Sequence, residues 1–169
     1  MKHFTRVFET PLDRMVTVVD EDGAVVLLAF LNGRSVDDHV APFAPLESSA
    51  AACSEVVEAV ARFFAGEPGV LERLHPRPAG TAFQHEVWSE VRKVPWGETA
   101  SYSEIAARIG RPGASRAVGR ANATNPVCLA IPCHRIVGAD GSLTGYGGGI
   151  ATKQALLDLE SGQRPLGLG

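Results

Sequence analysis

The segment LAIPCHRIV, residues 129–137, places the thiol of Cys133 directly before the imidazole of His134. A free thiol has a pKa of about 8.5, so a cysteine that acts as a thiolate nucleophile needs a base or a positive charge nearby. His134 is the nearest candidate base, in direct contact or through a bridging water, and Glu160 is a candidate carboxylate to orient its ring. Because most free cysteines are small buried residues, this segment alone fits a nucleophile and a core residue equally well.

The three cysteines, Cys53, Cys128 and Cys133, are expected to be reduced. Their number is odd and none of them forms a CxxC pair, which argues against a disulfide framework and a Cys-rich zinc site. Cys53 precedes an apolar helical stripe and Cys128 lies in the apolar run VCLAI, so both are expected in the core. The histidines before residue 80 lack the spacing of zinc ligands, so we expect no metal.

The length and composition of the chain indicate a globular protein with one substantial core or two small ones. It has 169 residues, of which 45% are hydrophobic, and a net charge of −3. No stretch approaches the roughly eighteen consecutive apolar residues that cross a bilayer, and the opening MKHFTRVFETPLDR lacks the apolar centre of a signal peptide. We therefore expect a cytoplasmic protein without a membrane partner.

The charged residues are unevenly distributed along the chain. Residues 1–80 hold seven basic and twelve acidic side chains, whereas residues 81–136 hold seven basic and four acidic ones. A locally basic segment can bind the phosphates of a nucleic acid even in an acidic protein. A group of arginines is also commonly a solvated face, so charge alone leaves both interpretations open.

The N-terminal half of the chain predicts a β-hairpin followed by a helix. Residues 14–31 contain two apolar, β-branched runs around Asp22-Gly23, a pair that supplies the positive φ of a tight turn. Between residues 49 and 65 the apolar side chains recur at helical spacing, and a glycine follows as a stop. The next stretch, residues 66–80, is rich in Gly and Pro, which is typical of a linker between two halves.

Beyond this stretch the sequence predicts a helix-turn-helix. An apolar stripe indicates a helix that ends before Pro95. Ser101 and Glu104 fit a capping box that opens the next helix, and Gly110 fits its C-terminal end. Turn residues at 111–113 then lead into another short helix, which completes the pattern.

The second helix of this pair carries small residues on one face. Ala114, Ala117 and Ala121 recur at spacings of three and four, with Gly119 nearby. Such a narrow face allows another backbone to come close. By itself the pattern favours packing against another helix over contact with a different macromolecule.

The last part of the chain predicts a turn, the glycine-rich loop GYGGG and a helix that reaches Glu160. The order FQHEVW, VPWGETASYSEIA, SRAVGRAN, IPCHRIVGADGSLTGYGGG and KQALLDLE resembles the O6-alkylguanine-DNA alkyltransferases, also called methylated-DNA-protein-cysteine methyltransferases, across residues 81–160. The block IPCHRIVG is similar to the active-site signature of that family. Residues 1–80 are compatible with its variable N-terminal domain.

The resemblance implies that Cys133 accepts an alkyl group from O6 of guanine in duplex DNA. Displacement at a saturated carbon needs a strong nucleophile, which a thiolate is. It also needs a leaving group whose developing negative charge is stabilised. By resemblance, His134 is the base acting through a water, Glu160 orients it, and Tyr102 hydrogen-bonds N3 of the departing base. The target carbon is inaccessible inside a stacked duplex, so the nucleotide has to be flipped out.

The resemblance also implies a surface that contacts DNA. Arg116 matches the family's arginine finger, which fills the gap left by the flipped base, although a plain surface arginine is the alternative. The small face of the same helix would enter the minor groove, unlike the usual helix-turn-helix mode. The residues assigned to DNA binding are Arg116, Ala117, Gly119, Arg120, Ala121 and Ser101.

Six further residues match the hinge and the base pocket of the family. Asn125 resembles a hinge that ties the small-faced helix to the active-site segment, and Arg135 is more typical of a structural residue than of a catalytic one. Several relatives place Ser where this chain has Gly147, so a side-chain hydroxyl is absent there while the backbone N–H remains. The set assigned to hinge and pocket is Asn125, Pro132, Arg135, Tyr146, Gly147 and Gly148.

Together these features predict an α+β fold in two domains. Residues 1–79 are expected to form an antiparallel β-sheet with a helix, ribonuclease-H-like, and residues 80–169 a mostly helical, winged-helix-like domain with the helix-turn-helix. We expect a monomer that needs no cofactor and binds double-stranded DNA. Two other functions remain open: a lesion-binding protein without activity, whose known members replace the cysteine, and an unrelated cysteine hydrolase, which would turn over repeatedly.

Overall fold

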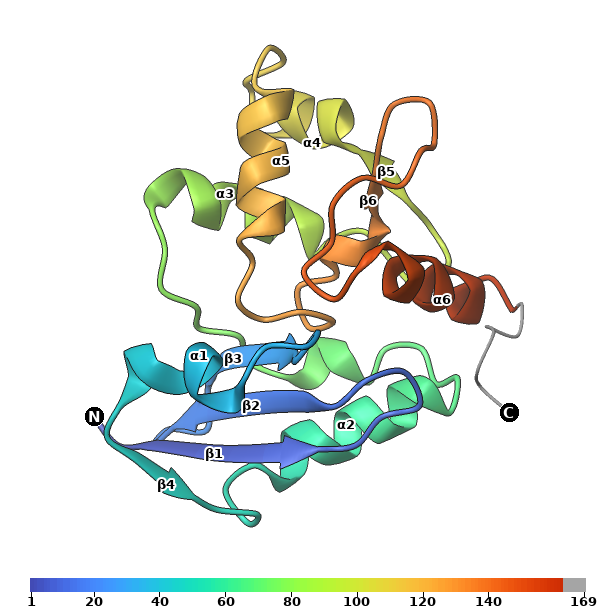
Figure 1. The fold of residues 1–169 in the computed structure, drawn as a ribbon. Helices are drawn as coiled ribbons and strands as arrows, with labels where there is room; N and C mark the ends of the chain where they lie inside the picture. Colours follow the sequence, from blue (N-terminus) through green and yellow to red (C-terminus); the bar gives the residue numbers. More distant parts are fainter. Residues whose placement is uncertain (163–169) are drawn as a thin grey trace. The chain divides into compact units, whose positions relative to one another are not determined.

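The computed structural model describes residues 1–162, which form two compact units (Figure 1). The first unit comprises Met1–Pro78 and Pro126–Ala130, and the second comprises Ala79–Asn125 and residues 131–162. The α+β class expected from the sequence is confirmed. The division into domains at residues 79 and 80 stays a prediction, and the end of the predicted second domain, 163–169, lies outside the described residues.

A four-stranded sheet in the order β3-β2-β1-β4 forms the first unit. Its strands are β1 (His3–Phe8), β2 (Met15–Asp20), β3 (Val25–Phe30) and β4 (Leu46–Ser48).

The predicted hairpin is confirmed as the antiparallel pair β2 and β3. Its turn places Gly23 at φ +83°, a conformation that glycine adopts without strain. Strand β1 is antiparallel to β2, but β4 runs parallel to β1, so the expectation of an antiparallel sheet is wrong for this edge strand. The chain reaches β4 through α1 (Val36–Val40) and η1 (Ala41–Phe43), a crossover of the kind that a parallel pair requires.

Helix α2 (Ser54–Phe64) confirms the helix predicted from the apolar spacing, although it begins five residues later than expected. Its buried residues continue the apolar core of the unit, in which all six residues of β2 are buried. Cys53 and Cys128 are both buried, as expected. In Figure 1, α2 lies along the sheet of this unit.

The stretch predicted as a linker is largely part of the first unit. Val70, Leu71 and Leu74 are buried, η2 (Leu71–Arg73) lies within it, and Pro76 pairs with Val25 of β3. The glycines and prolines suggested an exposed linker. The apolar side chains between them are instead buried in the core of the first unit.

A short segment from much later in the chain also joins this sheet. The backbone N–H of Leu28 donates to the carbonyl of Pro126 at 2.9 Å, and that of Cys128 donates to the carbonyl of Leu28 at 2.8 Å. Residues 126–130 therefore continue the hydrogen-bonding of β3 on its outer edge.

The second unit is mostly helical. Its elements are α3 (Ala82–Val91), α4 (Tyr102–Arg108), α5 (Ser115–Ala123), η3 (Cys133–Arg135), α6 (Ile150–Glu160) and the parallel strands β5 (Ala100–Ser101) and β6 (Ile136–Val137).

The helix-turn-helix predicted from turn and cap residues is confirmed as α4 and α5. Ser101 and Glu104 form the capping box at the start of α4, and Gly110 at φ +75° follows its end. No helix within residues 1–162 has both the length and the apolar content needed to cross a membrane.

Candidate active site and nucleic-acid interface

Cys133 opens a single 3₁₀ turn, η3, between a proline and strand β6. Pro132 has φ −78° and ψ 65°, and the Cys133 N–H donates to the Ile131 carbonyl at 2.7 Å, which is an inverse γ-turn. This turn breaks the extended chain and leads into η3, whose three side chains are all buried. Cys133 itself is 4% exposed and is therefore buried.

The imidazole of His134 and the carboxylate of Glu160 form a buried hydrogen-bonded pair. His134 Nε2 lies 2.8 Å from Glu160 Oε2, and His134 is fully buried. Helix α6 ends at Glu160, which brings this carboxylate back to the active-site turn from 26 residues away. The sequence prediction that Glu160 orients His134 therefore has the geometry that it requires.

Arg135 holds the other side of the same carboxylate. Its Nε and Nη2 donate to Glu160 Oε1 at 2.9 Å and Oε2 at 2.8 Å, a bidentate pair. Its Nη1 donates to the carbonyl of Val94 at 2.7 Å. Because these hydrogen bonds hold the guanidinium against Glu160 and Val94, Arg135 fits the structural role expected from the sequence.

The buried environment keeps His134 neutral and Glu160 ionised. Burial lowers the pKa of His134, against the hydrogen bond and charge of Glu160, which raise it. For Glu160, burial acts to raise the pKa, but hydrogen bonds and charges from His134 and Arg135 together bring it below its ordinary value. A neutral ring that donates through Nε2 leaves Nδ1 as its basic nitrogen, which is the state required of a general base.

Two asparagines of the α5 region fix the backbone on either side of Pro132. Asn125 Nδ2 donates to the carbonyl of Ile131 at 2.8 Å, and Asn122 Nδ2 donates to the carbonyl of Cys133 at 3.1 Å. Both contacts are buried, so they hold the active-site turn against the end of α5. The sequence prediction found Asn125 and missed Asn122, although the run Arg120–Asn125 contains both.

Lys153 is a second residue that the sequence prediction missed. It is fully buried on α6, and its Nζ donates to the carbonyls of Ile136 at 2.6 Å and Thr144 at 3.1 Å. Its Nζ also lies 5.9 Å from the ring centroid of Tyr102. The available signal was spacing, because Lys153 lies seven residues before Glu160 on the inward face of α6.

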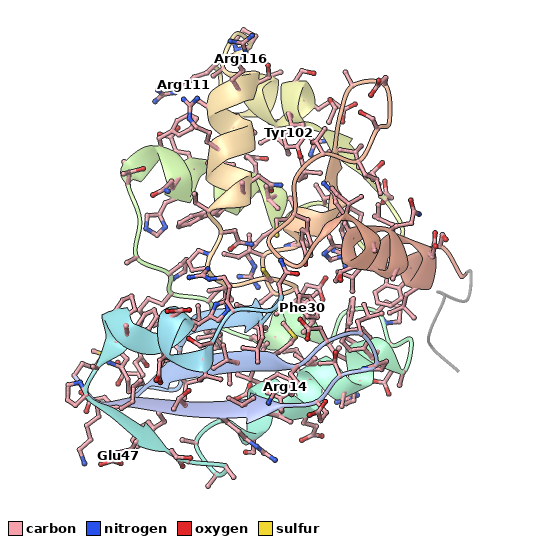
Figure 2. The ribbon with its side chains drawn as sticks, viewed as in Figure 1. Arg14, Phe30, Glu47, Tyr102, Arg111 and Arg116 are labelled. Atoms are coloured by element: carbon pink, nitrogen blue, oxygen red, sulfur yellow. The ribbon has the colours of Figure 1, made fainter. Side chains whose placement is uncertain are left out.

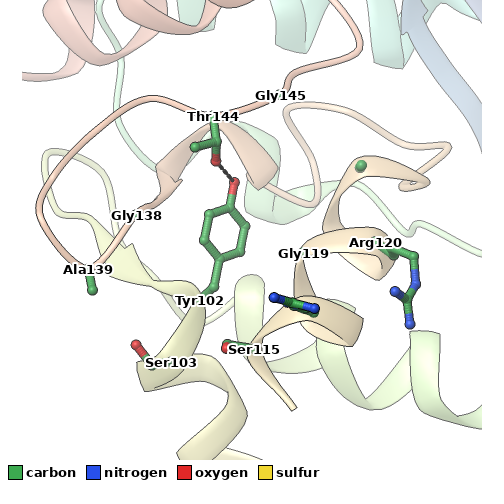
Figure 3. Close-up of a pocket in the computed structure, with 11 residues that line it drawn as sticks. Tyr102, Ser103, Ser115, Gly119, Arg120, Gly138, Ala139, Thr144 and Gly145 are labelled. Atoms are coloured by element: carbon green, nitrogen blue, oxygen red, sulfur yellow. Dashed lines mark hydrogen bonds between the residues drawn. The ribbon is translucent and has the colours of Figure 1, made fainter. Parts of the chain in front are cut away.

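An open groove of about 600 Å³ lies between α4, α5 and the loop after β6 (Figure 3). Figure 3 shows the side chain of Tyr102 pointing toward Thr144, and the two hydroxyl oxygens are 2.8 Å apart. The α5 side of the groove carries Arg116, Gly119 and Arg120. Cys133 is buried and is not among the residues that line the groove.

The expected DNA-binding residues fall into three positions. Arg116 and Arg120 are exposed, and Figure 2 shows Arg116 at the start of α5, near Arg111. Ala117 and Gly119 are half-buried beside them. Ser101 caps α4, where its hydroxyl accepts from the backbone N–H of Glu104, so its first role is structural.

Ala121 requires a correction. It is 3% exposed, and its carbonyl accepts a hydrogen bond from Trp88 Nε1 at 2.8 Å. Its face of α5 therefore packs against α3, so the small face of α5 expected to enter a groove does not include Ala121. The helix-packing interpretation of small residues holds at this position.

The glycine-rich loop leads into α6. Tyr146 is half-buried, Gly148 is buried, and Gly149 at φ +96° precedes the helix. A Cβ added at Gly147 would meet no heavy atom within 4 Å, so the space next to it is open. No three side chains of His, Cys, Asp or Glu gather into a metal site within residues 1–162.

Comparisons with known proteins identify the family. The profile of "6-O-methylguanine DNA methyltransferase, DNA binding domain" matches residues 82–162. The methylated-DNA–protein-cysteine methyltransferase of Mycobacterium tuberculosis is 51% identical over 118 residues, which are 69% of this chain and 70% of that protein. The protein of the same name from Methanosarcina acetivorans is 40% identical over 154 residues, 91% of this chain and 96% of the relative.

A solved structure agrees with these relatives. The crystal structure of Mycobacterium tuberculosis OGT in complex with DNA has a TM-score of 0.85 and 37% identity, and the match covers 98% of this chain and 97% of that one. The chain belongs to the methylated-DNA–protein-cysteine methyltransferase family.

Proposed function

We propose that this protein repairs DNA by direct reversal, taking the alkyl group of O6-alkylguanine onto Cys133. The observation that carries the proposal is the buried 2.8 Å contact of Glu160 with His134, the residue that directly follows the buried Cys133 in the chain. The sulfur forms a bond to the alkyl carbon as the carbon–O6 bond breaks. We expect the resulting thioether to be stable, so that each chain acts once.

The proton balance follows from the states of the buried groups. Neutral His134 takes the thiol proton, directly or through a water, and Glu160 stabilises the imidazolium that forms. The guanine leaves as an anion and takes up one proton while the His134 imidazolium gives one up, so the net products are alkylated Cys133, neutral His134 and unmodified guanine. Tyr102 donates a hydrogen bond to N3 of the base and offsets the developing charge.

We infer that DNA binds on the side of α5 that carries the groove. Arg116 and Arg120 are exposed there, and phosphate and groove contacts by arginine supply most of the affinity of such surfaces. Arg116 at the helix start fills the space of the flipped nucleotide, and Ala117 and Gly119 allow α5 to approach the minor groove. Ser101, at the start of α4, contributes to the same DNA-binding surface.

The remaining residues form the hinge and the base pocket. Asn125 and Pro132 shape the segment before Cys133, and Arg135 fixes Glu160. Tyr146, Gly147 and Gly148 wall the base pocket, with backbone N–H groups facing O6. In this proposal the protein is a cytoplasmic monomer of two domains, 1–79 and 80–169, and needs no cofactor.

In the decisive experiment the protein is mixed with a duplex that carries O6-methylguanine, and the masses of its peptides are measured by mass spectrometry. The expected result is one methyl group per chain, on the peptide that contains Cys133. The matched control is Cys128→Ser, which removes a buried thiol outside the site and is expected to keep full transfer. Label on Cys53 or Cys128, repeated turnover, or repair by Cys133→Ser would each overturn the proposal.

A further inference from the structure

Asn122 is a buried amide on α5, and only one end of the amide is hydrogen-bonded to another residue. Its side chain belongs to a residue that is 4% exposed, and its Nδ2 donates to the carbonyl of Cys133 at 3.1 Å. Its Oδ1 is buried as well, and no protein group within residues 1–162 donates to it. A buried acceptor without a donor is unfavourable for folding, because it has lost its hydrogen bonds to water.

An apolar side chain of similar shape would be the more stable choice at this position. Leucine branches at the same carbon as asparagine and brings no buried acceptor. The other buried side chains of α5, those of Val118 and Ala121, are apolar. The stability of the helix therefore gives no reason for an amide here, and its contact with Cys133 does.

The carbonyl that receives this hydrogen bond would keep a partner without Asn122. The backbone N–H of Ile136 also donates to the carbonyl of Cys133 and closes the turn η3. Removal of the amide would thus leave no buried acceptor without a donor, either at position 122 or in Cys133. What would be lost is the restraint that α5 places on the backbone of Cys133.

The peptide group that leads into Asn122 is itself held by another helix. The carbonyl of Ala121 belongs to this group, and Trp88 Nε1 on α3 donates to it at 2.8 Å. The ring of Trp88 lies against the backbone of Gly80, where an added Cβ would come within 2.6 Å of it. Two successive residues of α5 therefore connect α3 to the backbone of Cys133.

We propose that Asn122 is a positioning residue of the alkyl-transfer reaction, which fixes the backbone of Cys133 relative to α5 and is held in place by Trp88. Only Cβ separates the sulfur of Cys133 from the backbone, so a shift of the backbone moves the sulfur. The sulfur has to lie in line with the carbon–O6 bond, and a misplacement of about 1 Å can slow such a reaction about 100-fold. This inference rests on the proposed function.

The first test compares Asn122→Leu with wild type in the full chain. We expect an unfolding midpoint in denaturant equal to or above that of wild type, and an unchanged affinity for an unmodified duplex. The single-turnover rate of methyl transfer at saturating O6-methylguanine duplex should fall at least about tenfold. A merely structural role predicts that rate and stability fall together. A lower unfolding midpoint alongside the slower rate, or a wild-type rate, would therefore overturn the inference.

Thr17→Val is the matched control. Thr17 is fully buried in the first unit, and its hydroxyl donates to the carbonyl of Leu27 at 2.9 Å, so this buried polar group has its partner. Its replacement should lower the unfolding midpoint and leave the transfer rate unchanged. If leucine at position 122 prevents folding, Asn122→Ala removes the amide without added bulk and should slow transfer as well. A wild-type rate in Asn122→Ala would count against the inference in the same way.

A double-mutant cycle tests the link to Trp88. Trp88→Phe keeps a ring against Gly80 and removes the donor to Ala121. We expect this change to slow transfer in the wild-type background and to have no further effect in Asn122→Leu, because Trp88 acts through Asn122. Rate losses that multiply in the double variant would refute the link.

Methyl transfer by wild type separates this inference from the proposed function. If wild type places no methyl group on Cys133, the proposed function fails and the inference fails with it. If wild type and Asn122→Leu transfer equally fast, the proposed function stands and only the positioning role of Asn122 is refuted.

Discussion

The hydroxyl oxygens of Tyr102 and Thr144 lie 2.8 Å apart across the groove beside α5. This contact joins the start of α4 to the loop after β6 while no base is bound. In the proposed mechanism the Tyr102 hydroxyl has to turn from Thr144 to N3 of the guanine. Entry of the base and release of the loop are therefore linked events.

Replacement of Tyr102 by Phe is expected to slow transfer and to spare DNA binding. The phenol stabilises charge on the leaving guanine, and one such donor is worth about 10²–10³ in rate at an oxyanion site. The measurement is the single-turnover rate at saturating duplex, together with the affinity for an unmodified duplex. Thr144→Val is the matched control, because it removes the same hydrogen bond and leaves the phenol. An unchanged rate in Tyr102→Phe would defeat the assigned role.

Glu160→Gln is expected to destabilise the fold strongly. The change leaves the guanidinium of Arg135 buried without its counter-charge, a loss of about 3–5 kcal/mol in the free energy of unfolding. Denaturant unfolding measures it. The control is Glu67→Gln in the exposed pair with Arg62, where the loss should stay below about 1 kcal/mol. Equal losses in the free energy of unfolding of both variants would show that the buried ion pair stabilises the fold no more than the exposed one.

Acid is expected to destabilise the protein through His134. Burial holds the pKa of His134 below its ordinary value of 6.5, so the unfolded chain binds a proton that the folded chain does not. Stability therefore falls as the pH drops through about 6.5, and the depressed pKa of Glu160 adds a second loss as the pH falls below its ordinary value of 4.5.

The melting temperature between about pH 7.5 and pH 5.5 checks this expectation. His134→Gln should flatten the curve in that range, whereas His75→Gln, at an exposed position, should keep its slope. A curve of wild-type slope in His134→Gln would contradict the assignment.

Arg116→Ala is expected to lower the transfer rate even when the protein is saturated with DNA. If the side chain fills the space of the flipped nucleotide, its loss disfavours the extruded state as well as the first encounter. Arg116→Lys keeps the positive charge. Compared with Arg116→Ala, it should recover the salt dependence of DNA binding more fully than the rate of alkyl transfer. Rates equal to wild type at saturating duplex in both variants would leave Arg116 as an ordinary surface charge.

Gly147→Ser is expected to fold as wild type does. A Cβ at this position meets open space, so the change in the free energy of unfolding should stay within about 0.5 kcal/mol. If a hydroxyl here helps to hold O6 or the leaving oxygen, the variant transfers faster than wild type, and Gly147→Ala does not. Equal rates in Gly147→Ser and Gly147→Ala would show that the backbone N–H suffices.

The sequence was sufficient where local chemistry decides the structure. Cap residues such as Ser101 and Glu104 mark the start of α4 because they bond its own backbone. Residue chemistry offered Glu160 as a candidate partner of His134, the family resemblance implied the same pairing, and the structure brings the two side chains into contact. The predicted roles of both residues in catalysis remain predictions.

Features that depend on packing escaped prediction. The inward turn of Lys153 depends on two carbonyls that only the fold brings to it, and the typical lysine is exposed. Ala121 was assigned to a groove-facing surface through the family resemblance, whereas the small-residue pattern alone favoured the helix packing that its burial shows. The parallel strand β4 has three residues, too few to show a pattern.

The chain enters the N-terminal sheet a second time just before Cys133. Pro126 and Cys128 share hydrogen bonds with Leu28, and only four residues separate Cys128 from Cys133. A fragment cut at residue 80 would expose the apolar stretch 127–131 with no strand to receive it, and such an orphaned edge invites self-association. Dissecting the protein into halves is therefore expected to yield an insoluble catalytic piece, and co-expression of both halves should rescue it.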